Sequence, residues 1–272
     1  MNYIIGSGLT ALIAKHFHPE YKTIAPEQSI LPELFYLWDT EYTRKFCDEF
    51  NYEYKEKEVS IKTFGENVNA YNSVTHKPIG NKPCEGKKYF KSLEVKFELP
   101  QPDIIDTIRR VESKVMWGRE QYNYDKLIWT AHLDKTNFND KKYLVNYYPI
   151  SYLNIYTKQY LFDEDFAYFH DSEMLEREIY RASRQPYGYC FEIARLMSNL
   201  AKTADTFHIR KFFNADKFIK TKLAVNPRGF VSGESPINTD EIMFAGRYAE
   251  SNHEIKASDV IERFYKERDK NV

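Results

Sequence analysis

Three small residues near the start of the chain have the spacing of a dinucleotide-binding turn. Gly6, Gly8 and Ala11 lie in the stretch IIGSGLTALIAK, between an apolar strand and a helix-compatible run. In such a GxGxxA pattern the first glycine permits a tight turn, the second lets a pyrophosphate approach the backbone, and the alanine lets the helix pack on its strand. The helix N-terminus adds N–H donors and a positive dipole end. The pattern predicts a dinucleotide phosphate site; the alternative is a tight strand-to-helix turn with no ligand.

An acidic residue follows this turn at the distance expected for a ribose contact. A second strand is predicted at 21–25, and Glu27 lies 21 positions after Gly6. In dinucleotide-binding units an acid about 20 residues after the first glycine binds a ribose hydroxyl. We therefore expect Glu27 to contact the ribose, although this unit alone does not distinguish NAD from FAD.

The composition gives no global electrostatic reason to expect nucleic acid or a membrane as partner. Lysine and arginine number 39, aspartate and glutamate number 40, and the formal net charge is −1. The 272 residues include 22 tyrosines and 19 phenylalanines, ample for a packed core. No run reaches the roughly 18–20 apolar residues of a membrane span, and the N-terminus lacks the basic region of a signal peptide. We expect a soluble, cytoplasmic protein.

Cysteine and histidine spacing gives no metal or disulfide signature. Cys47, Cys84 and Cys190 are widely separated and odd in number, unlike a disulfide framework or a zinc site. The seven histidines show neither HExxH nor paired spacing. We predict no metal site, and the sequence assigns no catalytic side chain.

Hydrophobic periodicity predicts mixed strands and helices up to about residue 145. The predicted helices are 33–51 and 104–113, the latter capped by Asp103. The predicted strands are 59–63, with a possible hairpin partner at 68–71, then 93–99 and 125–130, and the segment 72–91 is predicted as a loop.

The second half of the chain shows closely spaced β-like runs, which favour an antiparallel sheet. They are 152–157, 166–170, 178–183 and 189–194. Residues 192–201 could instead be helical. A helix is expected over 216–221, although 218–225 could equally be a strand. Turns are predicted at 227–229 and 233–236. The chain then closes as it opens, with a strand at 240–245, the turn Gly246-Arg247 and a helix over 254–266.

Three stretches together resemble one group of flavoproteins. They are IIGSGLTALIAK, YDKLIWTAHLD and EIMFAGRYAESNHEIKASDVI, and they occur in the order seen in flavin amine oxidases and UDP-galactopyranose mutases. The resemblance covers about 100 residues at the two ends and the middle of the chain. It implies FAD as the cofactor.

The resemblance also implies cofactor-binding roles for residues from all three stretches. The first stretch would bind the ADP moiety, Gly246 and Arg247 the pyrophosphate, and the turn over 251–255 the flavin. Two helix N-termini and one guanidinium can together neutralise a pyrophosphate. The implied residues are Gly6, Ser7, Gly8, Leu9, Thr10, Ala11, Glu27, Thr130, Ala131, Gly246, Arg247, His253 and Ile255.

The expected fold class is α/β. It combines a Rossmann-like FAD/NAD(P)-binding domain built from both chain ends with a smaller α+β substrate domain that contains an antiparallel sheet. The expected boundaries are 1–50, 93–145 and 224–272 for the FAD-binding domain, and 51–92 and 146–223 for the substrate domain.

Candidates for substrate contact come from the predicted antiparallel sheet and one loop. Strand alternation places Arg181 and Ser183 on one face, and Tyr180, Ala182 and Arg184 on the other. An arginine could clamp a carboxylate or phosphate, or simply be solvent-exposed. The candidates are Arg181, Arg184, Tyr189 and His132, with core packing the alternative for Tyr189 and a plain loop position for His132.

Three function classes follow. The favoured one is an FAD-dependent oxidoreductase of amine-oxidase type, which takes a hydride from a C–N or similar bond onto flavin N5. The second is a flavin-dependent mutase or isomerase acting on a nucleotide sugar. The third is a non-catalytic nucleotide-binding module or an NAD(P)-dependent enzyme. The expected substrate is a small molecule or a modified residue of a polymer, without a membrane partner and with nucleic acid not indicated by net charge.

Overall fold

The computed structural model divides the chain into two compact units by its internal contacts. Unit 1 comprises Met1–Lys57, Lys91–Asn146 and Val231–Val272, and unit 2 comprises Glu58–Phe90 and Tyr147–Phe230. The structure describes residues 1–26, 35–76, 88–99, 101–108, 110–112, 115–117, 120–133, 137–138, 141–252 and 254–270.

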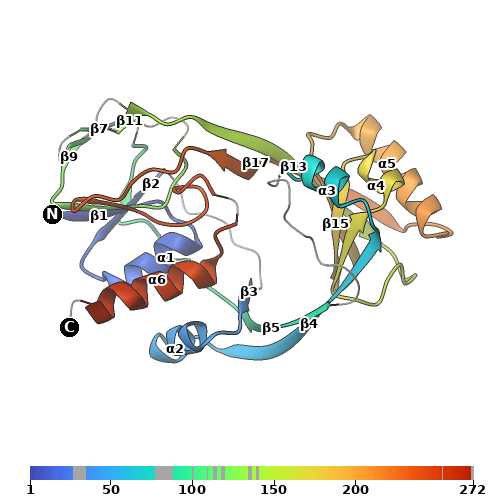
Figure 1. The fold of residues 1–272 in the computed structure, drawn as a ribbon, viewed down its shortest axis with the longest axis horizontal. Coiled ribbons are helices and arrows are strands. Elements are labelled where there is room, and N and C mark those ends of the chain that lie inside the picture. Colours follow the sequence, from blue (N-terminus) through green and yellow to red (C-terminus); the bar gives the residue numbers. More distant parts are fainter. Residues whose placement is uncertain are drawn as a thin grey trace. The chain divides into compact units, whose positions relative to one another are not determined.

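A five-stranded parallel sheet forms the centre of unit 1 (Figure 1). Its order is β18-β10-β1-β2-β6, and each neighbouring pair is parallel. The strands are β1 (Asn2–Ile5), β2 (Lys22–Ala25), β6 (Ile104–Ile105), β10 (Lys126–Trp129) and β18 (Ile242–Phe244). The first strand of the chain therefore lies in the middle, with its successors β2 and β6 on one side and β10 and β18 on the other.

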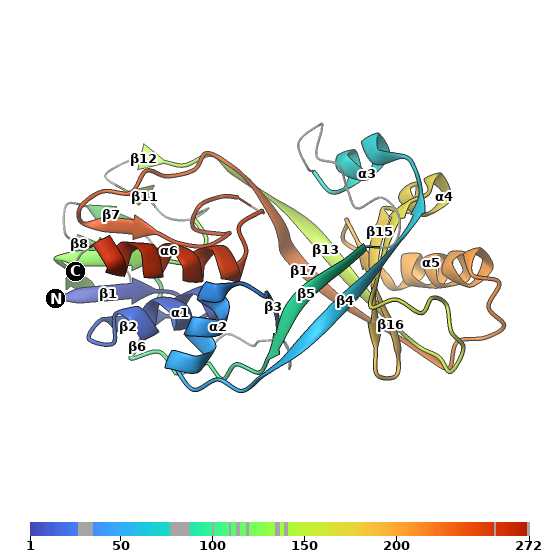
Figure 2. The ribbon, with the colours of Figure 1, turned by 60° about the horizontal axis from the view of Figure 1, so that its bottom comes forward.

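Two layers cover this sheet. A small sheet, of order β12-β11-β7-β8-β9, lies on one side of β1 and β2, and α1 and α6 lie on the other (Figure 1). Its strands are β7 (Arg110–Glu112), β8 (Val115–Trp117), β9 (Gln121–Asn123), β11 (Asn137–Phe138) and β12 (Lys141–Lys142). The helices of unit 1 are α1 (Leu9–Phe17), α2 (Glu41–Glu49) and α6 (Ala257–Lys270), and α6 packs against both α1 and α2 (Figure 2).

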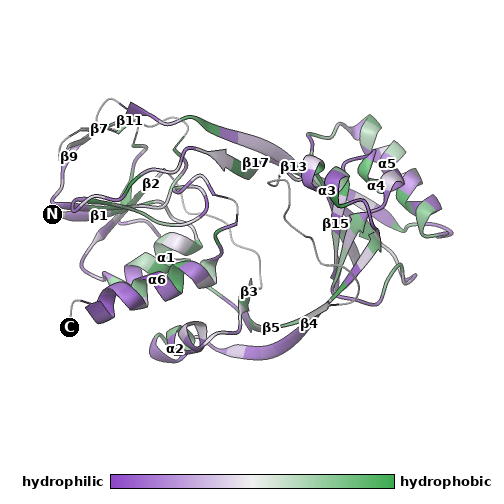
Figure 3. Ribbon diagram, in the orientation of Figure 1, coloured by the Kyte–Doolittle hydropathy of each residue, from purple (hydrophilic) through white to green (hydrophobic). Residues whose placement is uncertain are grey.

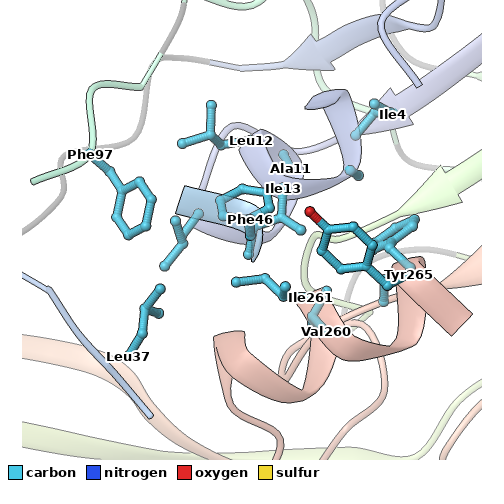
Figure 4. Close-up of a cluster of buried hydrophobic side chains, with 14 of the residues drawn as sticks. Ile4, Ala11, Leu12, Ile13, Leu37, Phe46, Phe97, Val260, Ile261 and Tyr265 are labelled. Carbon is cyan, nitrogen blue, oxygen red and sulfur yellow. The ribbon is translucent and has the colours of Figure 1, made fainter. Parts of the chain in front are cut away.

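Strand alternation sends side chains of the parallel sheet into two cores. Tyr3 and Ile5 of β1 join the core that includes Val111 and Phe138 of the small sheet. Ile4 joins the core formed with the helices (Figure 4). Burial on both faces is what a parallel sheet requires, and it fixes β1 firmly in place.

The helices bury one face each. In α6 the buried residues are Ser258, Val260, Ile261, Phe264 and Tyr265, at helical spacing, and the remainder of the helix is largely hydrophilic (Figure 3). Phe264 stacks on Phe17 at the end of α1, with ring centroids 5.3 Å apart. The two chain ends thus share one core.

An eight-stranded sheet contains the antiparallel strands of unit 2, and one of its pairs, β4 with β14, is parallel. Its order is β17-β13-β16-β15-β14-β4-β5-β3. The strands are β3 (Phe35–Trp38), β4 (Tyr54–Gly65), β5 (Lys88–Val95), β13 (Val145–Tyr156), β14 (Phe166–His170), β15 (Ile179–Gln185), β16 (Gly188–Ile193) and β17 (Lys220–Gly233). The helices are α3 (Val68–Val74), α4 (Ser172–Leu175) and α5 (Asn199–Phe212). Within the described residues, no helix is long and apolar enough to cross a bilayer.

Most predicted elements that flank the glycine turns are confirmed. The structure has β1, α1, β2, β10, β18 and α6 at the expected places, and the four expected strands of the second half are β13 to β16. The helix expected over 216–221 is wrong and the strand alternative over 218–225 is the correct one, since β17 begins at Lys220. Residues 77–87 of the loop predicted at 72–91 lie outside the described residues. Its two ends are not loop, since α3 extends to Val74 and β5 begins at Lys88.

Five further predictions are wrong, each for a physical reason. The described residues of the segment 104–113 are not helical, because Asp103 accepts hydrogen bonds from Thr23 N (2.7 Å) and Oγ1 (2.9 Å) and brings β6 beside β2. Residues 35–38 form β3, paired with β5, and the helix begins only after the Thr40 N-cap.

In the other three wrong predictions, the type or the boundary of a helix, strand or turn was misassigned. Residues 68–71 belong to α3, which Asn67 caps by accepting from Ala70 N. Residues 192–201 are not one helix, because β16 extends to Ile193 and α5 begins after the Ser198 N-cap. The turn expected at 227–229 lies inside β17.

Candidate functional site

The turn after β1 can hold only glycine at its first position. Gly6 has φ +125°, and a Cβ there would lie 2.3 Å from Thr130 Oγ1. Thr130 follows β10, and its Oγ1 and N both donate to Ile5 O, at 2.7 and 2.9 Å. Gly6 N donates to Ile24 O of β2 at 2.9 Å. The carboxyl ends of β1, β2 and β10 are therefore tied together at this turn.

A second glycine closes the same edge from β18. Gly246 has φ +90°, and a Cβ there would lie 2.6 Å from the hydroxyl of Thr10 in α1. Its N–H donates to Glu250 Oε1 at 2.8 Å, and Arg263 of α6 donates to both oxygens of Glu250, at 2.8 and 3.0 Å. These hydrogen bonds hold the turn after β18 close to the first turn of α1.

Gly8 leaves the N-terminus of α1 open. It is the N-cap, with φ −84° and ψ −174°, and no side chain caps the helix there. A Cβ on Gly8 would meet no atom within 4 Å. A small pocket lined by Gly6, Ser7, Ala11, Leu12, Thr23 and Pro102 adjoins it. Uncapped N–H groups with open space above them fit an anionic group such as a pyrophosphate.

The turn Gly6-Ser7-Gly8 and the open start of α1, together called the cradle, lie at a particular point of the sheet. The strand order reverses at β1, because β2 lies on one side and β10 on the other. Open parallel sheets bind their ligands outside the carboxyl ends of the strands at such a switch point. The glycine turn, Thr130 and Gly246 all lie there.

The structure places the remaining predicted cofactor residues in varied surroundings. Leu9 is buried in the helix-side core, and Ile255 packs at its edge. Ala131 accepts a hydrogen bond from the Trp129 indole at 2.9 Å. Arg247 is half-buried, and its carbonyl accepts from Asn252 N at 3.0 Å. Glu27 and His253 lie outside the described residues.

His132 pairs with an aromatic residue that the sequence did not single out. It follows Thr130 and Ala131 after β10, and its ring lies 4.2 Å from that of Tyr248, centroid to centroid. Tyr248 follows the Gly246-Arg247 turn. The two rings join the segments that follow β10 and β18.

A buried charge network marks one face of the sheet in unit 2. Glu192 of β16 is 6% exposed, and its Oε1 accepts from Nε and Nη2 of Arg181, at 2.9 and 2.6 Å. Its Oε2 accepts from the Tyr180 hydroxyl at 2.5 Å. Burial and the neighbouring Glu192 charge raise the pKa of Tyr180 well above its ordinary value. Burial alone would lower the pKa of Arg181, but Glu192 holds it well above its usual range.

Strand register gathers further polar and aromatic residues on this face. Tyr152 of β13 lies opposite Glu192, and Tyr168 of β14 lies opposite Arg181. Cys190 lies two residues before Glu192 in the same strand, on the same face. Burial, with a smaller contribution from Glu192, raises the pKa of the Cys190 thiol to about 12, so it stays protonated at neutral pH.

The alternation predicted for β15 is right except at Tyr180. Arg181 and Ser183 pair with Glu192 and Cys190, while Arg184 pairs with Tyr189 on the other face. A register shift between residues 179 and 181 brings the Tyr180 hydroxyl to Glu192 on the Arg181 face.

Two predicted substrate residues lie away from this face. Tyr189 is buried in the core under α5, and its hydroxyl donates to Phe162 O and accepts from Leu161 N, each at 3.0 Å. Arg184 is exposed, donates to Asp163 O at 3.0 Å and lies over the Tyr160 ring. The face with Arg181 therefore contains neither of them.

Sequence reasoning missed Glu192, Tyr180, Glu250 and Arg263. A usable signal existed for Glu192, because an acid inside a short apolar strand is costly unless a cation faces it. The pair of Glu250 and Arg263 had none, since its partners are joined only by tertiary packing. Among the described residues, no cluster of three histidine, cysteine or acidic side chains is arranged to hold a metal ion.

Comparison with solved structures identifies the fold. A candidate protoporphyrinogen oxidase from an Exiguobacterium species matches with TM-score 0.56 and 7% identity, over 99% of this chain and 98% of that one. Klebsiella pneumoniae HpxO, solved with FAD and uric acid, matches with TM-score 0.54 and 11% identity, over 97% and 77%. Glycine oxidase from Bacillus cereus matches with TM-score 0.51 and 9% identity, over 98% and 95%.

These likenesses are structural, since no protein-family model and no curated protein sequence matches the chain. The predicted fold class is confirmed: a Rossmann-like α/β fold with a parallel sheet, accompanied by a separate antiparallel sheet.

The two glycines of the turn make a matched test of the geometry. We expect Gly6→Ala to lower the free energy of unfolding by roughly 1–3 kcal/mol, because alanine is strained at positive φ and its Cβ would displace Thr130. Gly8→Ala should cost less, at most about 1 kcal/mol, since its Cβ would meet open space and only the N-cap preference for glycine over alanine is lost. Urea unfolding followed by circular dichroism measures both, and equal effects would contradict the assignment.

The Glu192 network gives a second stability prediction. Glu192→Ala removes the acceptor of Arg181 and Tyr180 and should destabilise the protein by about 2–3 kcal/mol, because a partly buried guanidinium loses its partner. Arg184→Ala, on the opposite face and exposed, serves as the control, with an expected change within about 0.5 kcal/mol. Thermal or urea unfolding distinguishes them, and a neutral Glu192→Ala would show that the network is not structural.

Proposed function

We propose that the chain is an FAD-dependent oxidoreductase whose unit 1 binds FAD and whose unit 2 contacts the substrate. The observation that carries the proposal is the open N-terminus of α1 above Gly8, at the switch point of a parallel sheet. The likeness to HpxO, a structure with bound FAD, and to glycine oxidase supports FAD over NAD(P).

In this proposal the residues of unit 1 bind the ADP half of the cofactor. The first N–H groups of α1 donate to the pyrophosphate, and Gly8 leaves room for it because it has no side chain. Thr130 and the Glu250–Arg263 pair act indirectly, because they hold the turns after β1 and β18 in position. Glu27 and Arg247 remain proposed contacts to ribose and pyrophosphate.

When bound, a flavin supplies a hydride acceptor at its N5 atom. Within the oxidoreductase class we propose the amine-oxidase type, in which the carbon bonded to an amine nitrogen loses a hydride to the flavin, the nitrogen loses a proton, and the C–N bond becomes C=N. The support is the charge of the Arg181 face. Glu192 neutralises Arg181, so the pair adds no net positive charge to attract a carboxylate or a diphosphate.

In this proposal the residues on the Arg181 face orient the substrate and do not transfer protons. Tyr152 and Tyr168 flank the Arg181–Glu192 pair and offer aromatic surface to an apolar or amine-bearing group. Because their pKa values are raised, Tyr180 keeps its proton and Cys190 its thiol at neutral pH. Neither is therefore a general base or a nucleophile in this proposal.

Flavin content of the purified protein tests the cofactor directly. We expect the absorption bands of oxidised flavin, and release followed by chromatography should identify FAD. Gly8→Asp should weaken FAD binding at least tenfold, about 1.4 kcal/mol, because it places a carboxylate where the pyrophosphate binds while its backbone angles suit any residue.

The matched control is Ser198→Asp at the N-cap of α5. It adds the same charge at another helix start, keeps a capping oxygen there, and should leave FAD binding unchanged. Isothermal titration of the apoprotein with FAD compares the two variants. Unaltered affinity in Gly8→Asp would remove the cradle from the cofactor site.

The amine-oxidase type is tested by a separate measurement. Anaerobic addition of primary amines or amino acids should bleach the bound flavin if the carbon next to the amine nitrogen loses a hydride to it. A flavoprotein that no amine reduces would retain the oxidoreductase assignment and overturn the amine-oxidase type.

A further inference from the structure

A groove on unit 2 lies between α5 and the start of β17, within a single compact unit. Its wall from α5 includes Lys202, Phe207 and Arg210, and its wall from β17 and the residues before it includes Lys217 and Lys220. None of the residues that line the groove is acidic.

No carboxylate of the described residues neutralises the cations of the groove. Among the residues that the structure describes, none of Lys202, Arg210, Lys217 and Lys220 forms an ion pair with a carboxylate. The segment 202–222 holds six lysines and arginines against two aspartates. One of these, Asp205, is buried and bound to Arg195. A chain of net charge −1 thus concentrates positive charge along one groove.

An exposed aromatic ring lies on the groove wall. Phe207 is 59% exposed, and the Arg210 guanidinium lies over its ring, 5.2 Å from the centroid. Exposure of a phenylalanine costs free energy unless a partner covers it. An exposed aromatic ring beside cations is a surface on which a nucleobase stacks.

The shape of this surface distinguishes a nucleic acid strand from a membrane. A bilayer takes up a continuous apolar helix face. α5 buries Ile209 in the core of unit 2 and shows mixed hydropathy along its length (Figure 3). Leu200 and Phe207 of α5 and Ile219 are exposed, but the groove itself has four cations beside Phe207 and Ile219. A concave line of cations beside one ring matches a strand in which phosphates alternate with flat bases.

We propose that this groove binds a single strand of nucleic acid. Lys202, Arg210, Lys217 and Lys220 contact its phosphates, and Phe207 stacks on a base. The site is independent of the proposed flavin chemistry, and it provides a way for the protein to engage a polymer rather than only a free small molecule.

Fluorescence anisotropy with a labelled 20-nucleotide single-stranded DNA and its RNA counterpart tests the proposal on the full chain. With three to four phosphate contacts, affinity should fall about 15- to 50-fold between 50 and 200 mM salt. Lys217→Glu/Lys220→Glu and, separately, Phe207→Ala should each weaken binding at least about tenfold.

The matched control is Lys55→Glu/Lys96→Glu, which makes the same charge change at exposed lysines of unit 1 and should leave binding unchanged. Circular dichroism and flavin content verify that each variant is folded. Absence of oligonucleotide binding, or equal loss in the control, overturns the proposal. So does binding to vesicles of anionic phospholipid without binding to either oligonucleotide, which would assign the groove to a membrane surface. None of these outcomes bears on whether the protein contains FAD.

Discussion

The close approach of Gly6 and Thr130 is the constraint on which unit 1 depends. Thr130 Oγ1 occupies the space that a Cβ on Gly6 would need, and it donates to Ile5 O. Because Gly6 has no side chain, the ends of β1 and β10 can approach each other this closely. Gly246 makes the equivalent approach to Thr10. Together they bring the ends of three strands to the start of α1, which is why residues over 100 positions apart form one edge.

This arrangement leaves a local deficit that a ligand can relieve. The N–H groups at the start of α1 lack a side-chain cap, and an uncapped terminus is worth about 1 kcal/mol less than a capped one. The fold tolerates this because β1 is buried between two cores, one shared with the helices and one with the small sheet. A bound anion would satisfy the donors and stabilise the folded state by mass action. Different residues therefore stabilise the fold and bind the ligand. The two cores hold β1 in place, and the turn at the start of α1 stays open for an anion.

The sequence was most informative where the determining interactions are local. The glycine turns, the strands β1, β10 and β18, and α6 follow from small-residue spacing and alternation within about ten residues. The failures arose where a distant partner decides the structure. Asp103 reads as a helix cap, yet it binds Thr23, 80 positions earlier. Residues 35–38 read as helix, yet they pair with β5. Arg181 could be placed on a strand face, but its neutralisation by Glu192 depends on the pairing of β15 with β16, and Tyr180 reaches Glu192 only through a register shift.

The cations of unit 2 fall into two groups, one paired with a carboxylate and one lining a groove without acidic residues. This difference affects which partners the unit can bind. Arg181 is matched by a buried carboxylate, so its charge contributes to positioning within the sheet. The cations around α5 lie in a groove without acidic residues. A whole-chain charge near zero averages over both and conceals the second, which is why composition gave no indication of a polyanion. Desolvating an unpaired cation costs free energy in any contact with an apolar surface, whereas a phosphate compensates that cost. The local distribution of charge, rather than its sum, therefore determines which partners the surface can accept.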